Sequence, residues 1–277
     1  MRNIKLTIEY DGKRYLGWQR LGDSEKTIQG KIESVIAQMT GEKIEIIGSG
    51  RTDAGTHARG QVANFKTNSE MARGEMLSFF NRYLPGDIVV KKVEEMPERF
   101  HARYNVKGKQ YSYYVWNNPI PTAFERYHSF YVPDKLDMDK MNAACEKLLG
   151  KHDFIGFSAL KKTKKSTTRT IERISIEREG SMLHFMFVGD GFLHKMVRIL
   201  MGTILEIGSG KLMRFWKIKC AKMQERLHQR KAFSWMKSII KQKAEFEHLF
   251  AQTQLLFSFL IHVRGQLDAS KHCKERQ

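Results

Sequence analysis

Cysteine, acidic side chains and long apolar runs are all scarce in this sequence of 277 residues. The longest apolar run, residues 255–261, is interrupted by a serine and is too short to span a bilayer. The N-terminus alternates polar and apolar residues and lacks the apolar core of a signal peptide. We therefore expect a reduced, soluble, cytoplasmic protein. Neither a disulfide framework nor a metal site is indicated, because the three cysteines are widely spaced: Cys145, Cys220 and Cys273.

The shortage of acidic residues leaves a strongly basic chain. There are 48 Lys and Arg against 30 Asp and Glu, which gives a formal net charge of +18 and a pI near 9.8. Such a charge favours an anionic partner, most plausibly a nucleic acid, although ribosome-bound and membrane-surface proteins share it. The hydrophobic content of 41% is sufficient for a packed core. The length suits one large domain or two small ones.

Residues 48–62 contain four glycines around a single carboxylate, Asp53. The stretch lacks the Lys-Ser/Thr pair of a phosphate-binding P-loop, and Asp53 stands where a dinucleotide fingerprint needs glycine. It has no second carboxylate for a paired acid–base site, and His57 has no metal-ligand neighbour at a zinc spacing. What remains is a lone carboxylate two residues after Arg51. It could serve as a nucleophile or base, or simply cap a turn through its own backbone.

The pattern of apolar residues predicts the elements of the first half. Alternation predicts strands at residues 4–10, 43–47, 61–67 and 87–93, and helical spacing predicts helices at 28–39 and 76–83. The order is β-α-β-β-α-β, the split β-α-β or ferredoxin-like arrangement. The loop with Asp53 then lies between two strands, a frame that can hold a side chain rigidly while exposing it.

The second half follows the same plan more loosely. We expect strands at residues 111–116, 130–132, 171–177 and 183–188, and helices at 136–149 and 192–207. We divide the chain into an N-terminal catalytic half (1–105), a C-terminal half (106–211) and a basic tail (212–277). The tail carries a net charge of +9, half of the excess of the whole chain.

Several motifs resemble one family. Residues 50–58, Gly-Arg-Thr-Asp-Ala-Gly-Thr-His-Ala, closely resemble the signature of the tRNA pseudouridine synthase A (TruA) family. Residues 8–12, 17–19, 100–103, 109–113 and 192–198 match further family motifs in the expected order. The resemblance covers about residues 3–211, and several independent motifs in order make it highly specific.

The resemblance implies a fold, a reaction and a partner. The fold is α+β: two ferredoxin-like halves joined into one mainly antiparallel sheet with helices on one side and the active cleft between the halves. The reaction is isomerisation of uridine to pseudouridine in the anticodon stem-loop of tRNA, at positions 38 to 40, with no cofactor and no metal. The family is homodimeric, so we expect a homodimer that binds tRNA.

The resemblance also assigns roles to residues. Asp53 becomes the catalytic nucleophile or base. Arg51 pairs with Asp53 or with the backbone of a flipped nucleotide, whereas an exposed surface charge would mean little. Arg198 lies beside the catalytic carboxylate in the family, although a simple ion pair is the alternative. Tyr111 stacks on the target base, although a core aromatic is the default for its strand.

Further basic residues are candidates for contacts with the tRNA backbone. Phosphate contacts position a substrate without reading its sequence. The lysine run at residues 161–165 is equally consistent with a solvated surface. The candidates nearest the central loop are Arg14, Arg20, His57 and Arg59.

The tail departs from the family pattern from about residue 212. Family members continue with a helix and a final strand that closes the uridine pocket, and no such text is present here. Residues 255–261 could form a strand in its place. The departure leaves a second hypothesis open, a catalytically impaired tRNA-binding protein.

Overall fold

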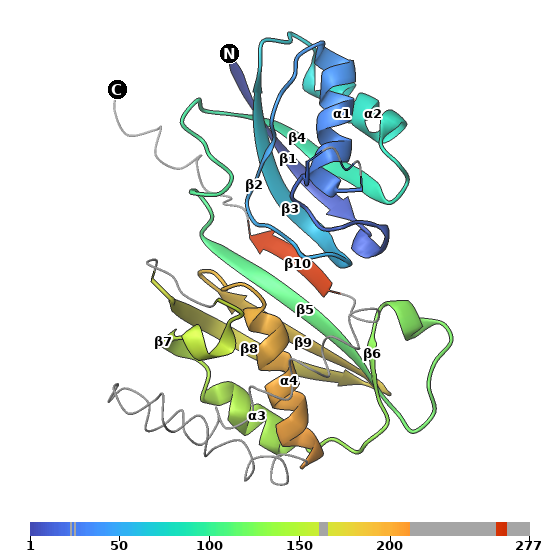
Figure 1. Cartoon of the computed structure of the whole chain (residues 1–277), viewed down its shortest axis with the longest axis vertical. Helices are drawn as coiled ribbons and strands as arrows, with labels where there is room; N and C mark the ends of the chain where they lie inside the picture. The colour runs from blue at the N-terminus through green and yellow to red at the C-terminus, as the bar shows by residue number, and fades with distance from the viewer. Residues whose placement is uncertain (23, 25, 161–165, 211–258, 265–277) are drawn as a thin grey trace, which may run out of the picture. The chain divides into compact units, whose positions relative to one another are not determined.

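The computed structural model describes residues 1–22, 24, 26–160, 166–210 and 259–264, the last stretch as backbone only. These residues form two compact units (Figure 1). The first comprises residues 1–112 together with the strand β10 (Phe259–Arg264), and the second begins at Tyr113. The sequence places this division at residue 105. The lysine run at 161–165 and the rest of the tail lie outside the described residues.

Three long strands form the sheet of the first unit. β1 (Arg2–Tyr10) lies between β3 (Thr56–Thr67) and β4 (Ile88–Met96) and is antiparallel to both. Alternate residues of β1, Ile4, Leu6 and Ile8, are fully buried, as the period of a strand requires. The predicted strand at 4–10 is thereby confirmed.

Two helices complete the first unit. α1 (Ile28–Thr40) begins at Thr27, whose side chain accepts a hydrogen bond from the Gly30 N–H, and ends at Gly41 in the left-handed conformation. α2 (Arg73–Tyr83) contacts both α1 and β4. A short 3₁₀ turn, η1 (Gly12–Arg14), follows β1. With β2 (Ile47–Gly48) between α1 and β3, the predicted β-α-β-β-α-β order is confirmed.

The strand predicted at residues 43–47 is wrong in extent. Of the predicted residues only Ile47 is in a strand: β2 pairs with β3 through Ile47 opposite Asn64 and Gly48 opposite Ala63. The backbone N–H of Ile46 instead donates to Glu33 Oε1 at 3.0 Å, so it is not available to a neighbouring strand. β3, in turn, begins at residue 56 rather than 61.

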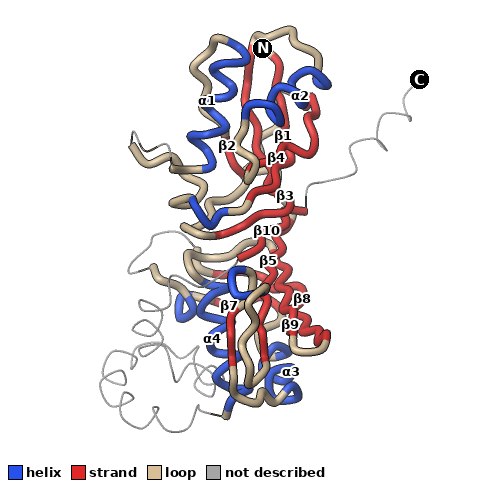
Figure 2. The backbone as a smooth tube through the Cα atoms, turned by 90° about the vertical axis from the view of Figure 1, so that its right-hand side faces the viewer, coloured by secondary structure: helices blue, strands red, loops and turns tan. Residues whose placement is uncertain are grey.

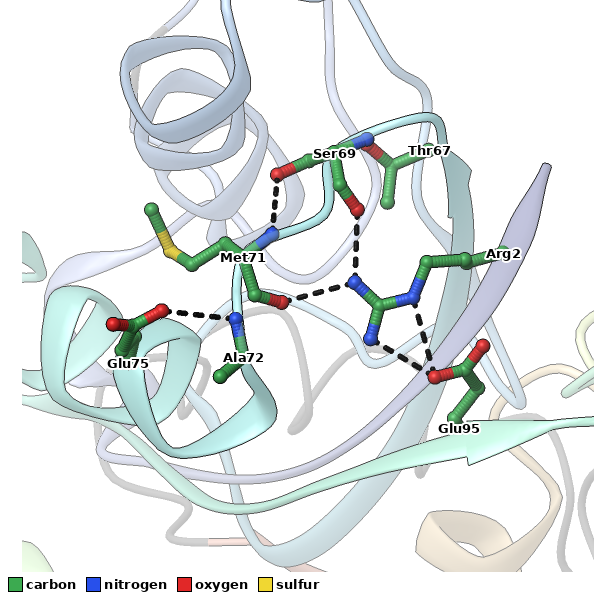
Figure 3. Close-up of polar contacts among 7 residues, drawn as sticks. All are labelled: Arg2, Thr67, Ser69, Met71, Ala72, Glu75 and Glu95. Atoms are coloured by element: carbon green, nitrogen blue, oxygen red, sulfur yellow. Dashed lines mark hydrogen bonds and ion pairs between the residues drawn. The ribbon is translucent and has the colours of Figure 1, made fainter.

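Arg2 fixes the connection between β3 and α2. Its guanidinium donates to the carbonyl oxygens of Ser69 (2.8 Å) and Met71 (2.9 Å) and pairs with Glu95 on β4 (2.9 Å) (Figure 3). One side chain on β1 thereby holds both the connection and the neighbouring edge strand. This network contributes to stability and includes no candidate site residue.

The second unit contains a sheet in the order β5-β9-β8-β7. β5 begins in the first unit, while β6 pairs parallel with β5, and β8 pairs antiparallel with both β7 and β9. Helices α3 and α4 contact each other, and α3 contacts β8. The elements are β5 (Gly108–Asn117), η2 (Glu125–Tyr127), β6 (Phe130–Val132), α3 (Met138–Glu146), β7 (Gly150–Asp153), η3 (Ile155–Phe157), β8 (Thr168–Glu179), β9 (Met182–Gly189) and α4 (Met196–Ser209).

Two helix boundaries of the second unit differ from the prediction. α3 is shorter than 136–149, because Asp137 caps its start and β7, which the sequence pattern does not reveal, follows closely. α4 begins at Met196 rather than at residue 192, because Lys195 adopts the left-handed conformation (φ 59°), which a right-handed helix excludes.

The tail contributes one described strand. β10 runs parallel to β3, with Phe259 opposite Thr56 and His262 opposite Gly60 (Figures 1 and 2). Of the strand expected at 255–261, residues 259–261 belong to β10, which continues to residue 264, and residues 255–258 lie outside the described residues. The fold is therefore the expected mixed arrangement of helices and largely antiparallel sheet. The joining of the halves into one sheet and the cleft between them stay predictions.

Candidate active site

The loop that carries Asp53 connects β2 to β3. Its turn closes where the Thr56 N–H donates to the Asp53 carbonyl oxygen at 3.2 Å, and Gly55 takes a φ of +73° that favours glycine. The Asp53 side chain is half-buried. It therefore lies on a defined turn, partly screened from water and still open to a ligand.

A buried hydroxyl pair lies beneath this loop. The Tyr10 hydroxyl is 3.0 Å from Thr52 Oγ1, and both residues are buried. Burial raises the pKa of Tyr10 strongly, the hydrogen bond from Thr52 opposes it in part, and the neighbouring Tyr111 raises it further. Tyr10 therefore stays a neutral phenol, and its hydrogen bond holds Thr52, the residue before Asp53.

Gln61 on β3 holds the start of the loop through both ends of its amide. Its Oε1 accepts the Ser49 hydroxyl at 2.7 Å, and its Nε2 donates to the Gly50 carbonyl at 2.7 Å. The Ser49 N–H also donates to the Val62 carbonyl at 2.8 Å. Gln61 is fully buried, so losing either bond would leave polar groups without water to replace the partner.

The segment after β1 holds the loop from another side. The Trp18 N–H donates to the Thr52 carbonyl (3.1 Å), and the Gly55 N–H donates to the Tyr15 carbonyl (3.2 Å). Gly17 has a φ of +103°, and a Cβ at this position would lie 2.5 Å from the Thr52 oxygen. Only glycine fits here, because both the backbone angle and the close approach exclude a side chain.

Lys109 on β5 adds a contact that the sequence reasoning missed. Its Nζ donates to the Ser49 carbonyl at 3.0 Å, and a Cβ on Gly50 would lie 3.0 Å from the same nitrogen. Lys109 stands in one of the matching motifs, two residues before Tyr111, and that position is the signal that could have indicated it. Tyr111 itself is half-buried and influences the Tyr10 phenol, so it adjoins the same loop.

The arginines near the loop fall into two groups. Arg51 and Arg59 are exposed and make no hydrogen bond or ion pair with any residue that the structure describes. The structure therefore shows no pairing of Arg51 with Asp53, and the alternative, a contact with the backbone of a flipped nucleotide, stays a prediction. Arg14 pairs with Asp87 at 2.6 Å, and Arg20 lies 3.4 Å from the buried Glu33, while Arg20 keeps 46% of its side chain exposed.

His57 lies in the protein interior rather than at the surface. Its Nδ1 is 2.9 Å from Asp11 Oδ1, and only 8% of its side chain is exposed. A direct contact with a phosphate would need the ring to be uncovered. Of the side chains predicted to contact the RNA backbone, that of His57 is therefore the least accessible.

Arg198 belongs to the second unit. It lies in the first turn of α4 and is buried, among apolar neighbours in sequence that include Val197 and Leu200. A guanidinium in such a position needs a compensating interaction. Its contribution to catalysis stays a prediction.

The described residues contain neither a cluster of metal ligands nor a membrane-spanning helix. Across the described ranges, no three His, Cys, Asp or Glu side chains cluster closely enough to hold a metal ion. Within the same ranges, no helix combines the length and apolarity needed to cross a bilayer.

Comparison with known proteins bears on this loop. A family model described as tRNA pseudouridine synthase matches residues 6–105 and 144–239, a range that includes the Asp53 loop and Arg198. The chain belongs to this family. It is 51% identical over 211 residues to tRNA pseudouridine synthase A of Bacillus sp. (strain KSM-64), covering 76% of this chain and 86% of that protein.

Two further relatives have the same coverage, 76% of this chain and 86% of theirs. They are tRNA pseudouridine synthase A of Acetivibrio thermocellus (strain ATCC 27405 / DSM 1237 / JCM 9322 / NBRC 103400 / NCIMB 10682 / NRRL B-4536 / VPI 7372), 47% identical, and tRNA pseudouridine synthase A 2 of Clostridium perfringens (strain 13 / Type A), 48% identical. The family match ends at residue 239, beyond residue 212, near which we expect the sequence to depart from the family pattern. The position of that departure stays a prediction.

Proposed function

We propose that this chain isomerises uridine to pseudouridine in tRNA, with Asp53 as the nucleophile or base. The observation that carries the proposal is the Asp53 loop. It contains the family signature, and buried groups of β1, β3 and β5 hold it while the carboxylate stays partly open. A tRNA pseudouridine synthase needs such a group against the target nucleotide, and membership of the family supports the assignment.

The chemistry asks for one positioned carboxylate. The N-glycosidic bond to N1 breaks, the uracil turns, and a bond forms between C5 and C1′ of the ribose. N1 gains a proton and C5 loses one, so no oxidant or reductant is needed. Asp53 can attack C1′, add to C6 or take a proton from C2′, and all three routes begin from the ionised form.

The target uridine must leave its stack to reach Asp53. Extrusion of a base costs a few kcal/mol, which interactions with the protein must offset. We assign phosphate contacts to Arg51, Arg59, Arg14 and Arg20, but not to the buried His57, and the net charge of +18 supports an RNA partner. Tyr111 would stack on the extruded base. Arg198 would act on the catalytic carboxylate.

Finer features belong to the same proposal. The substrate site is the anticodon stem-loop at positions 38 to 40, the enzyme is a homodimer, and it acts in the cytoplasm. The first two follow from the family resemblance, and the third follows from the composition of the chain. The alternative, a catalytically impaired tRNA-binding protein, rests on the loss of the final family strand. β10 weighs against it, because that strand of the tail pairs with β3 immediately after the Asp53 loop.

Tritium release from tRNA labelled at uracil C5 tests the proposal, because C5 loses its hydrogen in the reaction. We expect release by the parent chain and none by Asp53→Ala, with both proteins still binding tRNA. Substituting the target uridine by cytidine in the transcript should abolish release by the parent. Binding without release by the parent would overturn the proposed activity and favour the impaired binder.

A further inference from the structure

The turn after β4, residues 99–107, presents aromatic and basic side chains together. Tyr104 has 78% of its surface exposed, yet its ring stacks on that of His101, with centroids 4.2 Å apart and planes at 29°. Arg99, Arg103 and Lys107 are exposed on the same turn, and their side chains make no hydrogen bond or ion pair with any described residue. The stretch contains no acidic residue.

Buried polar groups hold this turn in place. Asn3 on β1 donates to the carbonyl oxygens of Pro97 (3.1 Å), Glu98 (3.3 Å) and Phe100 (2.8 Å). Asn64 on β3 accepts the Ala102 N–H at 2.8 Å and donates to the Asn3 side chain at 2.9 Å. Both asparagines are only 2% exposed. The backbone that enters the turn is thus fixed from the core of the sheet.

The exposed ring pair is itself held by local hydrogen bonds. His101 Nδ1 accepts the backbone N–H of Arg103 at 3.2 Å, and the Tyr104 N–H donates to the His101 carbonyl at 3.1 Å. Asn105 Oδ1 accepts the His101 N–H at 2.8 Å. These contacts orient an exposed aromatic pair before any ligand arrives, which reduces the entropy lost on binding.

We infer that His101 and Tyr104 form a stacking platform for an unpaired base of the tRNA, with Arg99, Arg103 and Lys107 binding the adjoining phosphates. Exposed aromatic rings among cations are the combination that binds single-stranded nucleic acid, because every base offers a π-face and every linkage a charge. The inference rests on the proposed function for its choice of RNA.

The platform is close to the candidate active site along the chain. Tyr104 precedes Lys109 by five residues, so their Cα atoms lie within about 18 Å of each other, and Lys109 contacts the Asp53 loop through Ser49. The platform is thus near enough for its base and the uridine at Asp53 to belong to one RNA molecule, and we assign it a nucleotide other than that uridine. The platform would fix the position of the RNA relative to the target.

A groove of about 730 Å³ borders the same turn and makes a poorer site for RNA. His101 lines both. The lining of the groove contains as many carboxylates as Lys and Arg side chains, so the groove offers a phosphate no net attraction. The platform, which has cations only, is the part of this surface that suits a polyanion.

Binding of a transcribed tRNA to the full chain tests the platform. We expect Tyr104→Leu to weaken the Kd about tenfold, and Tyr104→Phe to stay close to the parent, because stacking needs the ring and not the hydroxyl. The matched control is Tyr83→Leu, since Tyr83 on α2 is 43% exposed and its ring also contacts another aromatic ring, that of Phe79, with centroids 4.4 Å apart. Unfolding temperatures should differ little among the variants.

Salt dependence and a substrate change separate stacking from charge. Arg103→Gln should reduce the slope of log K against log salt by about one, whereas Tyr104→Leu should lower affinity at an unchanged slope. A second test uses a set of anticodon stem-loops that each lack the base at one position. In the stem-loop that lacks the base stacked on the platform, which is at an unpaired position, Tyr104→Leu should no longer weaken binding, because the base and the Tyr104 ring form a single contact.

An unchanged Kd for a folded Tyr104→Leu protein, or effects additive with every abasic substitution, would overturn the platform. Neither result depends on turnover. If the parent released no tritium while Tyr104→Leu still weakened binding, the proposed reaction would fail and the platform would stand.

Discussion

The two units differ in where they bury polar groups. Among described residues, the first unit buries twelve polar or charged side chains and the second only three, one of them Arg198. Of these, Gln61 contacts the Asp53 loop, as the buried phenol of Tyr10 also does, and Asn3 and Asn64 hold the turn of the platform. The comparison teaches that the first unit positions groups by hydrogen bonds, while the second is an apolar scaffold that carries one buried cation.

Arg198→Met gives the largest expected effect in this comparison. If Arg198 stabilises charge at the active site, the single-turnover rate of pseudouridine formation should fall about 10²–10³-fold. Since the buried part of α4 is otherwise almost entirely apolar, methionine should pack there and change the unfolding temperature little. Leu200→Met in the same helix is the control and should leave the rate unchanged. A large loss of stability with a normal rate would make Arg198 a structural residue and weaken the contrast between the units.

Gln61→Leu tests the positioning role of the first unit. The substitution removes both bonds that hold Ser49 and Gly50, so we expect the single-turnover rate to fall about 10²-fold as Asp53 loses its alignment. Stability should fall by about 1–3 kcal/mol, because two buried polar groups lose their partner.

Asn81→Leu is the matched control for Gln61→Leu. The Asn81 amide makes the same two-ended contact with the backbone of Val90, at 2.9 Å in each direction, away from the Asp53 loop. It should lower the unfolding temperature and leave the rate unchanged. Equal rate losses in both variants would show that Gln61→Leu acts by reducing the amount of folded protein and not by misplacing Asp53.

Gly17→Ala should have a smaller effect. A methyl group would lie 2.5 Å from the Thr52 carbonyl oxygen, so the backbone of the Asp53 loop would have to move to admit it. We expect a rate about tenfold lower in single-turnover assays, since the displaced atom is one residue from Asp53. Gly41→Ala is the control: its φ of +71° adds a similar backbone strain of about 1 kcal/mol, but nothing lies within 4 Å. A rate loss in Gly41→Ala would contradict the argument.

The sequence predicted the fold of the first unit well, because its burial alternates regularly. On β1, Ile4, Leu6 and Ile8 face the core, as their alternation in the sequence predicts. Gly41 ends α1, as its residue type predicts. The strand at 43–47 failed because a side chain distant in sequence, Glu33, takes the Ile46 N–H. No local pattern reports such a competition.

The site was predictable in its centre and not in its supports. The glycine-rich stretch indicated Asp53, but Gln61 and Lys109 act through backbone atoms of the loop, which leave no trace in its sequence. The arginines show the same limit. Composition marks Arg14 and Arg51 alike, whereas the structure gives Arg14 a carboxylate partner and leaves Arg51 exposed.

Asp87→Asn should change the rate least, and its effect should appear in stability against pH. Burial raises the pKa of Asp87, but hydrogen bonds from Tyr15 and Arg14 outweigh it, so the pKa lies below its usual value. A lowered pKa means that the carboxylate stabilises the fold above about pH 4 and that this contribution disappears as the pH falls through the folded-state pKa.

At pH 7, Asp87→Asn should therefore unfold at lower urea concentration, by about 1.5–3 kcal/mol for bonds to a charged group. The difference from the parent should shrink steadily as the pH is lowered from about 5 to 2. Glu98→Gln is the control, because Glu98 is an exposed carboxylate with a 3.6 Å ion pair to Lys66 and should track the parent at every pH. A pH-independent difference for Asp87→Asn would show that shape, and not charge, holds the segment after β1 against the sheet. In that case, the polar positioning seen around Asp53 would not extend to Asp87.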